Sequence, residues 1–495
     1  MTTQTAVLIG LVIYACLMFG VSYFWMRRVK KATDYLLAGR GLSTLILTGT
    51  VTATGVGTGV VIGASGLAYQ HGWAGCAYPI GLGLGSVLAG LFFAKMRRYK
   101  FMTLGEEIAC YCGKNRFVVE FSYISLFFSQ LCWLTVQIMG GGAVLSVVTG
   151  LDTTLCVVLA GLVTATISIP GGLKTVVYAD FIQAIILLLG FGFLAYAALS
   201  DVGGMIGLQQ RVPEEYFSFL GSASYGSWEV FSLILVLVLS IVADPGRRLA
   251  MYSARTESGA KWGMIIGGTI VVIFSVVVGI TGMYAYQLNP EIPAADQALP
   301  WLVINVLPSW LAAIVVVSIA SSVFSSANTN AATAGTFYIR HIYPLIGRAY
   351  PKKPLVAVRR ALSCAFILCT VLALYTGNIV EFVVQFLPLT MSGLAVIILL
   401  GRFWKRATWQ GAIAALVTTP LVALAVMFIP TLTEYWGNPT IPATAAGLII
   451  HFSVSMFTPP PQHSFEEIAN SMTRERESIE RTSAESESPE AMTSA

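Results

Sequence analysis

The sequence predicts an all-α integral membrane protein, and composition, apolar runs and the placement of basic residues all support this fold class. Of the 495 residues, 56% are hydrophobic and 11% are charged, and the mean hydropathy is +0.76, values outside the range of soluble domains. Apolar runs of about 20 residues, enough to cross a bilayer, recur along the chain. About thirteen spans are expected, at 5–26, 43–69, 73–96, 118–147, 153–169, 174–199, 228–250, 262–286, 302–343, 359–376, 379–401, 408–429 and 440–457.

Basic residues indicate the orientation of these spans. With the first span starting outside, all of the 29 Lys and Arg except Arg211 fall on one side of the membrane. The positive-inside rule then predicts an extracytoplasmic N-terminus and a cytoplasmic C-terminus in the cell membrane. No basic residue precedes the first span, so we expect no cleavable signal peptide.

The end of the chain differs in composition from the membrane body. From Pro459 onward it carries eight Glu and three Arg, whereas the rest of the chain carries a net charge of +10. We attribute the basic balance of the body to membrane topology rather than to nucleic-acid binding. The predicted organisation is an extra helix and cytoplasmic loop at 1–42, a first repeat at 43–199, a second repeat at 228–401, two further helices at 402–458, and a disordered acidic cytoplasmic tail at 459–495.

Two spans carry residues that interrupt a helix. Gly49–Gly66 contains six glycines, each of which costs about 1 kcal/mol in a helix interior relative to alanine. Non-helical backbone survives at membrane depth only where it lines a protein cavity, so this span predicts a binding site. Pro245 and Gly246 interrupt another span five helices later. Interruptions at corresponding positions suggest two inverted five-helix repeats, as in many transporters.

Polar residues inside two spans are candidate site residues. Asp180 lies six residues into its span; it is either an acid stabilised by the helix dipole or a functional group. Ser318–Thr333 is rich in hydroxyl groups, which permit close helix packing but also suit a monovalent cation. Ser322, Ser325 and Ser326 share one helix face, which permits an ion site without requiring one.

Four segments together resemble the sodium:solute symporter family, whose members include bacterial proline, pantothenate, sialic acid and sugar transporters and animal glucose and choline transporters. The resemblance implies a leucine-transporter-type fold with inverted 5+5 helix repeats and a solute cavity at the membrane midplane. The segments are Asp34–Ser43 (DYLLAGRGLS), Pro170–Gln183 (PGGLKTVVYADFIQ), the serine-rich span that ends at Tyr343, and Gly401–Ala412 (GRFWKRATWQGA).

The resemblance also implies ion-site residues. Sodium would be bound by two main-chain carbonyls of the interrupted span, one carbonyl of the serine-rich span and two hydroxyls of the latter. These groups correspond to Ala53 and Val56, to Ser322, and to Ser325 and Ser326. Relatives with a second sodium use an acid and further hydroxyls, at positions that here hold Asp180, Asn328 and Thr329. With asparagine at one position, these three residues are candidates either for a second cation or for the exit path of the ion.

The sequence gives less information about the identity of the solute than about the sodium site. Gly55 stands where some proline-type relatives carry an acid, and the tryptophan of choline-type relatives is also missing. Hydroxyls beside exposed main-chain amides suit a carboxylate or a polyol, although each candidate is equally well explained by helix packing. The candidate cavity residues are Thr54, Thr58, Gln130, Trp133, Gln137 and Gln385.

These observations predict a secondary active transporter that carries a small polar organic solute, such as an amino acid, carboxylate, sugar or vitamin, into the cell with sodium by alternating access. Proton coupling through Asp180 is the alternative, and a membrane nutrient sensor is a more distant one. The eight cysteines and four histidines form no ligand cluster, so neither an enzyme nor a cofactor is expected. The expected partners are the solute, Na⁺ and the lipid bilayer, with no nucleic acid, in a monomer or weak oligomer.

Overall fold

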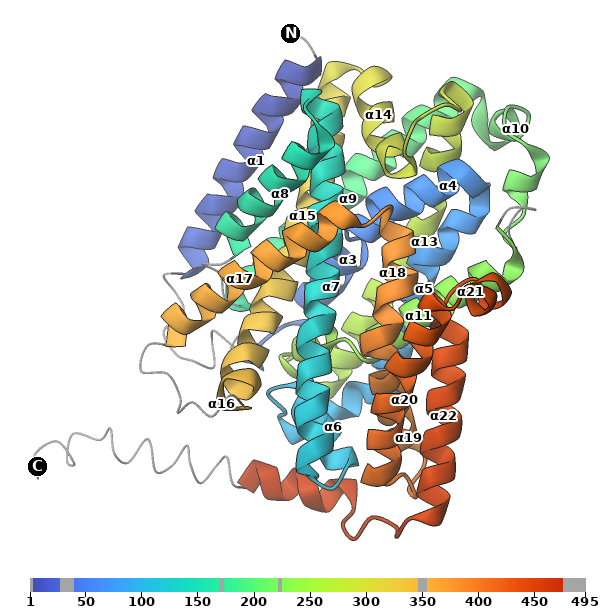
Figure 1. Cartoon of the computed structure of the whole chain (residues 1–495). Helices are drawn as coiled ribbons and strands as arrows, with labels where there is room; N and C mark the ends of the chain where they lie inside the picture. The colour runs from blue at the N-terminus through green and yellow to red at the C-terminus, as the bar shows by residue number, and fades with distance from the viewer. Residues whose placement is uncertain (1–2, 27–39, 169–172, 221–224, 346–353, 475–495) are drawn as a thin grey trace, which may run out of the picture.

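The computed structural model describes residues 3–26, 40–168, 173–220, 225–345 and 354–474 (Figure 1). Within these ranges the regular structure is helical, with one isolated bridge between Leu42 and Ala254. Several predicted features lie outside the described residues. They are the basic loops at 27–39 and 346–353, the beginning of the Asp34–Ser43 motif, residues 170–172, and the tail from 475.

The helices follow the predicted spans. The first half contains α1 (Thr3–Met26), α3 (Thr44–Gly55), α4 (Ser65–His71), α5 (Ala77–Phe93), α6 (Leu104–Tyr111), α7 (Arg116–Thr149), α8 (Thr153–Ser168) and α9 (Leu173–Val202). The second half contains α10 (Gly204–Gln209), α11 (Ser227–Val242), α12 (Pro245–Tyr252), α13 (Glu257–Leu288), α14 (Ala298–Asn305), α15 (Ser309–Phe337), α16 (Tyr343–Leu345), α17 (Pro354–Tyr375), α18 (Ile379–Leu387), α19 (Gly393–Phe403), α20 (Trp409–Phe428), α21 (Pro430–Trp436) and α22 (Thr440–Phe457).

The number of membrane spans remains a prediction. Each of the thirteen expected ranges coincides with helix, and the long range 302–343 divides into α14 and α15. Among the described residues, nine helices are long and apolar enough to cross a membrane, or ten if the bent pair α11 and α12 counts as one span. Two shorter apolar helices, Thr3–Met18 and Thr153–Thr166, add to these.

The interrupted helix expected in Gly49–Gly66 is present. α3 ends at Gly55, and the chain resumes in a π-helical turn at Gly59–Ala64 that leads into α4. We call the intervening residues Val56–Thr58 the α3 break. The glycines here permit close approach rather than unusual dihedral angles. A Cβ at Gly55 would lie 2.6 Å from Val271 Cγ2, and one at Gly57 would lie 2.7 Å from Ser326 Oγ.

The second interruption lies between α11 and α12, whose axes differ by 45°. Asp244 begins α12 because its carboxylate accepts a hydrogen bond from the Gly246 amide at 2.8 Å, and Pro245 occupies the first helical turn, both typical of helix N-termini. α12 contacts α3, α13 and α15, and α3 also packs against α9. The two interrupted helices therefore meet in the interior of the bundle.

The two ends of the bundle carry different elements. In Figure 1, α1 begins at the end that holds α10 and α14, whereas α6 and a helix at residues 465–474 lie at the opposite end. The start of α1 and the helix at 465–474 therefore lie at opposite ends of the bundle, as expected for a chain that crosses the membrane an odd number of times.

The helix at 465–474 corrects part of the expected disordered tail. Phe465 packs against Tyr99 and Tyr111 at ring-centroid distances of 5.3 and 4.9 Å, and Ile468 and Ala469 are buried. Phe465, Ile468 and Ala469 share one helix face. Average composition concealed this short apolar stripe within an acidic, serine-rich segment.

Candidate ion and solute site

The α3 break leaves main-chain carbonyls available for other partners. Two of these carbonyls face serines of α15. Ser325 Oγ donates to Ala53 O at 3.3 Å, and Ser322 Oγ donates to Val56 O at 2.9 Å. All of these groups are buried. The interrupted helix and the serine-rich helix therefore meet at carbonyl and hydroxyl oxygens.

The remaining predicted ligands lie at the same place. Ser325 Oγ is 3.2 Å from Ser322 O. Ser326 Oγ is buried and has no hydrogen-bond partner among the described residues. It faces the α3 break, because the space that a Gly57 Cβ would occupy is 2.7 Å away. The structure thus brings together all five residues named from the sequence, namely Ala53, Val56, Ser322, Ser325 and Ser326.

The spacing of these oxygens suits a small hard cation. Two oxygens that each lie about 2.4 Å from a cation, at right angles to one another, are about 3.4 Å apart. The separations of Ser325 Oγ from Ala53 O and from Ser322 O, 3.3 and 3.2 Å, are close to this value. Every oxygen in the set is neutral, which favours a cation that must also be released. The hydroxyl of Ser326, which has no hydrogen-bond partner among the described residues, is available to coordinate a cation.

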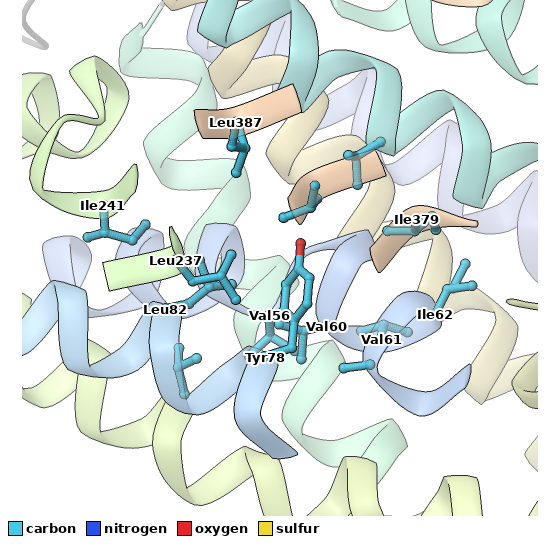
Figure 2. Packing of buried hydrophobic residues seen from close by; sticks show 14 of the residues in the cluster. Val56, Val60, Val61, Ile62, Tyr78, Leu82, Leu237, Ile241, Ile379 and Leu387 are labelled. Atoms are coloured by element: carbon cyan, nitrogen blue, oxygen red, sulfur yellow. The ribbon is translucent and has the colours of Figure 1, made fainter. Parts of the chain in front are cut away.

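A cavity of about 50 Å³ adjoins these oxygens. The α3 break, α5, α7, α11, α12 and α15 all contribute to its wall. One side is apolar and includes Tyr78, Leu82 and Ile241. Figure 2 shows Tyr78 beside Val56 and Val60, and Leu82 beside Leu237. The lining residues are Thr50, Val51, Thr54, Gly55, Gly57, Gly59, Val60, Tyr78, Leu82, Trp133, Gln137, Ile241, Asp244, Gly246, Arg247, Ala250, Ser326, Thr329 and Asn330.

Three of the predicted cavity residues, Thr54, Trp133 and Gln137, line this cavity. The hydroxyl of Thr58 instead donates to Gln137 Oε1, which joins the α3 break to α7. Gln130 also lies behind the wall, where its Nε2 is 3.5 Å from Asp244 Oδ1.

Gln385 lies elsewhere. It lines a separate cavity of about 320 Å³ together with Glu229 and Glu381, and its amide donates to Glu381 Oε1 at 3.2 Å. An exposed pair four residues apart on a helix accounts for this glutamine.

The three residues considered for a second cation are not joined by hydrogen bonds in the described part of the chain. Asp180 is fully buried, and neither of its carboxylate oxygens has a hydrogen-bond partner there. Asn328 Oδ1 and Thr329 Oγ1 are also unpartnered. Thr329 lines the cavity beside Gly246. Three buried polar groups thus lack partners, which is unusual in a folded protein.

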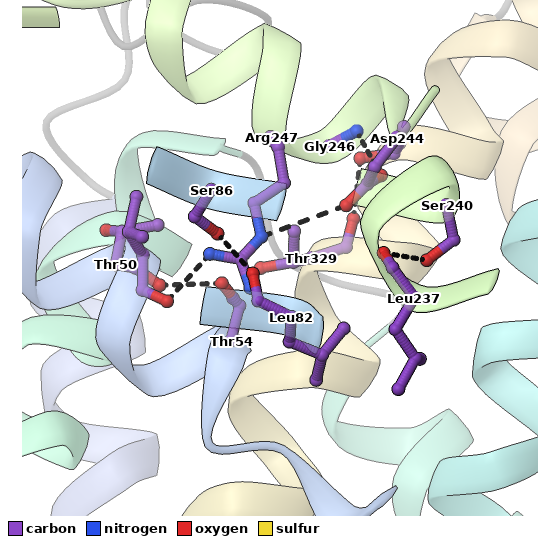
Figure 3. A network of polar contacts seen from close by, with 12 residues as sticks. Thr50, Thr54, Leu82, Ser86, Leu237, Ser240, Asp244, Gly246, Arg247 and Thr329 are labelled. Carbon is purple, nitrogen blue, oxygen red and sulfur yellow. Dashed lines mark hydrogen bonds and ion pairs between the residues drawn. The ribbon is translucent and has the colours of Figure 1, made fainter. Parts of the chain in front are cut away.

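The structure adds a residue that the sequence did not place in the site. Arg247 is 5% exposed and lines the cavity, with its Nη1 donating to Val51 O at 2.7 Å (Figure 3). Its Nε lies 3.9 Å from Asp244 Oδ2. The positive-inside rule assigns this arginine to the water-exposed cytoplasmic side, whereas the structure buries it in α12. The only available signal was its position directly after Asp244-Pro245-Gly246, which starts a helix inside the membrane.

Arg248 is likewise buried rather than in a loop. Its Nη1 lies 3.1 and 3.2 Å from the two carboxylate oxygens of Glu107, and its guanidinium stacks 3.7 Å above the Phe93 ring. Tyr111 and Tyr252 also donate to Glu107. These contacts tie α12 to α6, next to the helix at 465–474.

Residues 35–419 match the sodium:solute symporter family. The chain belongs to this family. Among similar curated proteins are the sodium/pantothenate symporter of Escherichia coli (strain K12), 25% identical with 90% of this chain and 95% of the relative covered, and the sodium/glucose cotransporter of Vibrio parahaemolyticus, 27% identical with 84% of each covered.

Solved structures agree on the fold. A Na⁺-coupled sialic acid symporter in a substrate-bound outward-open state superposes with a TM-score of 0.75 at 18% identity, covering 94% of this chain and 99% of the other. Mhp1, a nucleobase-cation-symport-1 family transporter, gives 0.54 at 13% identity, covering 89% and 99%. The leucine-transporter fold predicted from the sequence is confirmed. This symporter is a multi-pass membrane protein that couples sodium to the transport of a small solute.

Proposed function

We propose that the coupling sodium binds at the α3 break, between the carbonyls of Ala53, Val56 and Ser322 and the hydroxyls of Ser325 and Ser326. The observation that carries this proposal is the convergence of Ser322 and Ser325 on the two free carbonyls, at 2.9 and 3.3 Å. Ser326 supports it, because its buried hydroxyl has no partner among the described residues. Separation of α3 from α15 would dismantle the site and release the ion.

The solute would occupy the adjacent cavity, with Thr54, Trp133 and Gln137 in its wall. Ser326 lines the cavity and belongs to the ion site, so sodium binding would organise one wall of the solute site. Alternating access around this fixed pair of sites would carry both inward. The membrane potential contributes about 2.3 kcal/mol per net charge per 100 mV to accumulation.

Asp180 motivates the second candidate, which is proton coupling. A buried carboxylate without hydrogen-bond partners suits either a proton carrier or a group that assists a second cation. Sodium remains the better candidate for the principal coupling ion, since the neutral oxygens at the α3 break serve a cation and have no role in a proton relay.

Uptake into proteoliposomes separates the two ions. A panel of labelled amino acids, monocarboxylates, sugars and vitamins would be offered under a sodium gradient or a pH gradient, to the wild type, Asp180→Asn and a control, Asp201→Asn, on the same helix. We expect sodium-driven uptake in the wild type that Asp180→Asn weakens and the control retains. Sodium-free, pH-driven uptake that is lost in Asp180→Asn would contradict the proposal.

We place the protein in the cell membrane with its N-terminus outside and its C-terminus in the cytoplasm, as a monomer or weak oligomer. The positions of the two helix interruptions support repeats at 43–199 and 228–401.

A further inference from the structure

Arg247 presents hydrogen-bond donors to the cavity that no described residue accepts. Its Nη1 is engaged by Val51 O at 2.7 Å, whereas its Nη2 and Nε have no hydrogen-bond acceptor among the described residues. The absence of a side chain at Gly55 keeps the space beside Nη2 open, because a Cβ there would lie 3.2 Å from that nitrogen. A guanidinium carries five N–H donors in a planar fork. Donors that face a cavity need an acceptor from whatever occupies it, whether water or a bound solute.

Asp244 does not fill this role. Its Oδ1 accepts from the Gly246 amide at 2.8 Å and lies 3.5 Å from the Gln130 amide. Its Oδ2 is 3.9 Å from Arg247 Nε, which is an ion-pair distance but not a hydrogen bond. Figure 3 shows the guanidinium directed away from Asp244, toward Thr50 and Thr54 of α3. Asp244 and the buried Asp180 both interact electrostatically with Arg247 and offset its charge, but neither occupies its Nη2 and Nε donors.

We infer that the transported solute carries a carboxylate and that Arg247 binds it in the cavity. This inference rests on the proposed function, since it concerns the solute of the same symporter. A planar guanidinium matches the geometry of a carboxylate and forms stronger hydrogen bonds with it than with a neutral acceptor. The cavity of about 50 Å³ has room for about three to five water-sized groups, so the shortest carboxylates would fit without rearrangement.

The charge of the ion site favours the same class of solute. The five proposed sodium ligands are neutral, so the bound ion brings a positive charge that its own ligands do not offset. Ser326 borders both the ion site and the cavity, which places a solute carboxylate near that charge. In a low-dielectric interior such charges interact strongly. Sodium and an anionic solute would thereby raise each other's affinity by the same factor.

Other solute classes fit the wall less well. A sugar or polyol presents hydroxyls that must also donate hydrogen bonds, and a guanidinium accepts none. An amino acid zwitterion requires an acceptor for its ammonium group. Asp244 lines the cavity, and its Oδ2 accepts no hydrogen bond from a described residue, so it would accept from the ammonium, and a zwitterionic amino acid stays within the carboxylate class.

Matched pairs of solutes test the inference on the purified full-length protein. Sodium-dependent thermal stabilisation would be measured with lactate against lactamide, pantothenate against panthenol, and the neutral solutes glucose and myo-inositol. The variants are Arg247→Gln, Arg247→Lys and a control, Arg255→Gln, which changes an exposed arginine outside the cavity. Binding of radioactive sodium without solute checks that each variant is folded.

We expect at least one carboxylate, and no uncharged analogue, to stabilise the wild type in sodium. Arg247→Gln should lower the affinity for that carboxylate at least tenfold, and Arg247→Lys should lower it less. Arg255→Gln should leave the affinity unchanged. If Arg247→Gln does not fold, the discrimination by the wild type decides the question.

Equal binding of a carboxylate and its uncharged analogue, failure of every carboxylate to bind, or unchanged affinity in a folded Arg247→Gln would overturn the inference. Sodium-driven uptake of glucose that Arg247→Gln leaves unaltered would overturn it while leaving sodium symport intact. Carboxylate binding that depends on Arg247 but not on sodium would support it and contradict the proposed function.

Discussion

Removing single hydroxyls from α15 should weaken the binding of sodium without disrupting the helix. In Ser326→Ala and Ser325→Ala the ion loses one of five proposed oxygens. A hydrogen bond to a charged group is worth about 1.5–3 kcal/mol, and we assume a similar value for a hydroxyl on sodium. Since about 1.4 kcal/mol corresponds to a tenfold change, the apparent sodium affinity should fall about 10- to 150-fold. Solute affinity at saturating sodium should change less.

The two serines should differ in their effect on stability. Ser325 Oγ bonds two carbonyls, so its loss should cost about 1 kcal/mol per bond. Ser326 Oγ bonds none among the described residues, and Ser326→Ala should leave the melting temperature without sodium nearly unchanged.

Sodium titration of uptake and thermal unfolding would measure both effects. Ser318→Ala is the matched control, because its hydroxyl also bonds two carbonyls of α9 and α15, at 3.0 and 2.9 Å. Wild-type sodium dependence in the Ser325→Ala, Ser326→Ala double variant would refute the reasoning and leave these serines as packing residues.

Single-cysteine labelling should find residue 405 (Lys405) inside and residue 211 (Arg211) outside; both on one side would refute the orientation. Glu107→Gln breaks a buried ion pair and should destabilise the protein by about 3–5 kcal/mol, whereas the exposed Glu257→Gln should cost at most about 1 kcal/mol; equal melting temperatures would contradict this. Burial raises the pKa of Asp296, in the segment before α14, to about 6, so its contribution to stability is full below pH 4 and is lost as the pH rises through 6; a pH scan of melting should show that loss in the wild type and not in Asp296→Asn.

The interrupted helix and the serine-rich helix that packs against it were predictable from sequence. Each contains residues that destabilise a membrane helix and are therefore expected mainly where they form a binding site. Glycines weaken a helix, and hydroxyls are poor substitutes for apolar groups in lipid, so Gly49–Gly66 and Ser318–Thr333 stand out without any knowledge of the fold. The family resemblance then gave the register that pairs Ala53 and Val56 with the serines of α15. The structure adds the distances between them.

Residues whose role depends on tertiary packing could not be predicted in this way. The positive-inside rule assigns Arg247 and Arg248, at the end of the expected span 228–250, to the cytoplasmic side, because the sequence alone does not show that a short helix is buried by its neighbours. Gln385 looked like a cavity residue because it is polar within an apolar run, yet it faces a different cavity. The apolar face of the helix at 465–474 was too short to stand out against an acidic background.

Binding of radioactive sodium to the purified protein tests the central claim most directly, because it requires neither the solute nor transport. We predict saturable binding by the wild type and by Ser318→Ala, and binding weakened by at least 100-fold in the Ser325→Ala, Ser326→Ala double variant, in line with two lost contacts of about 1.5–3 kcal/mol each. Wild-type sodium affinity in a folded double variant would contradict the assignment of the coupling ion to the α3 break.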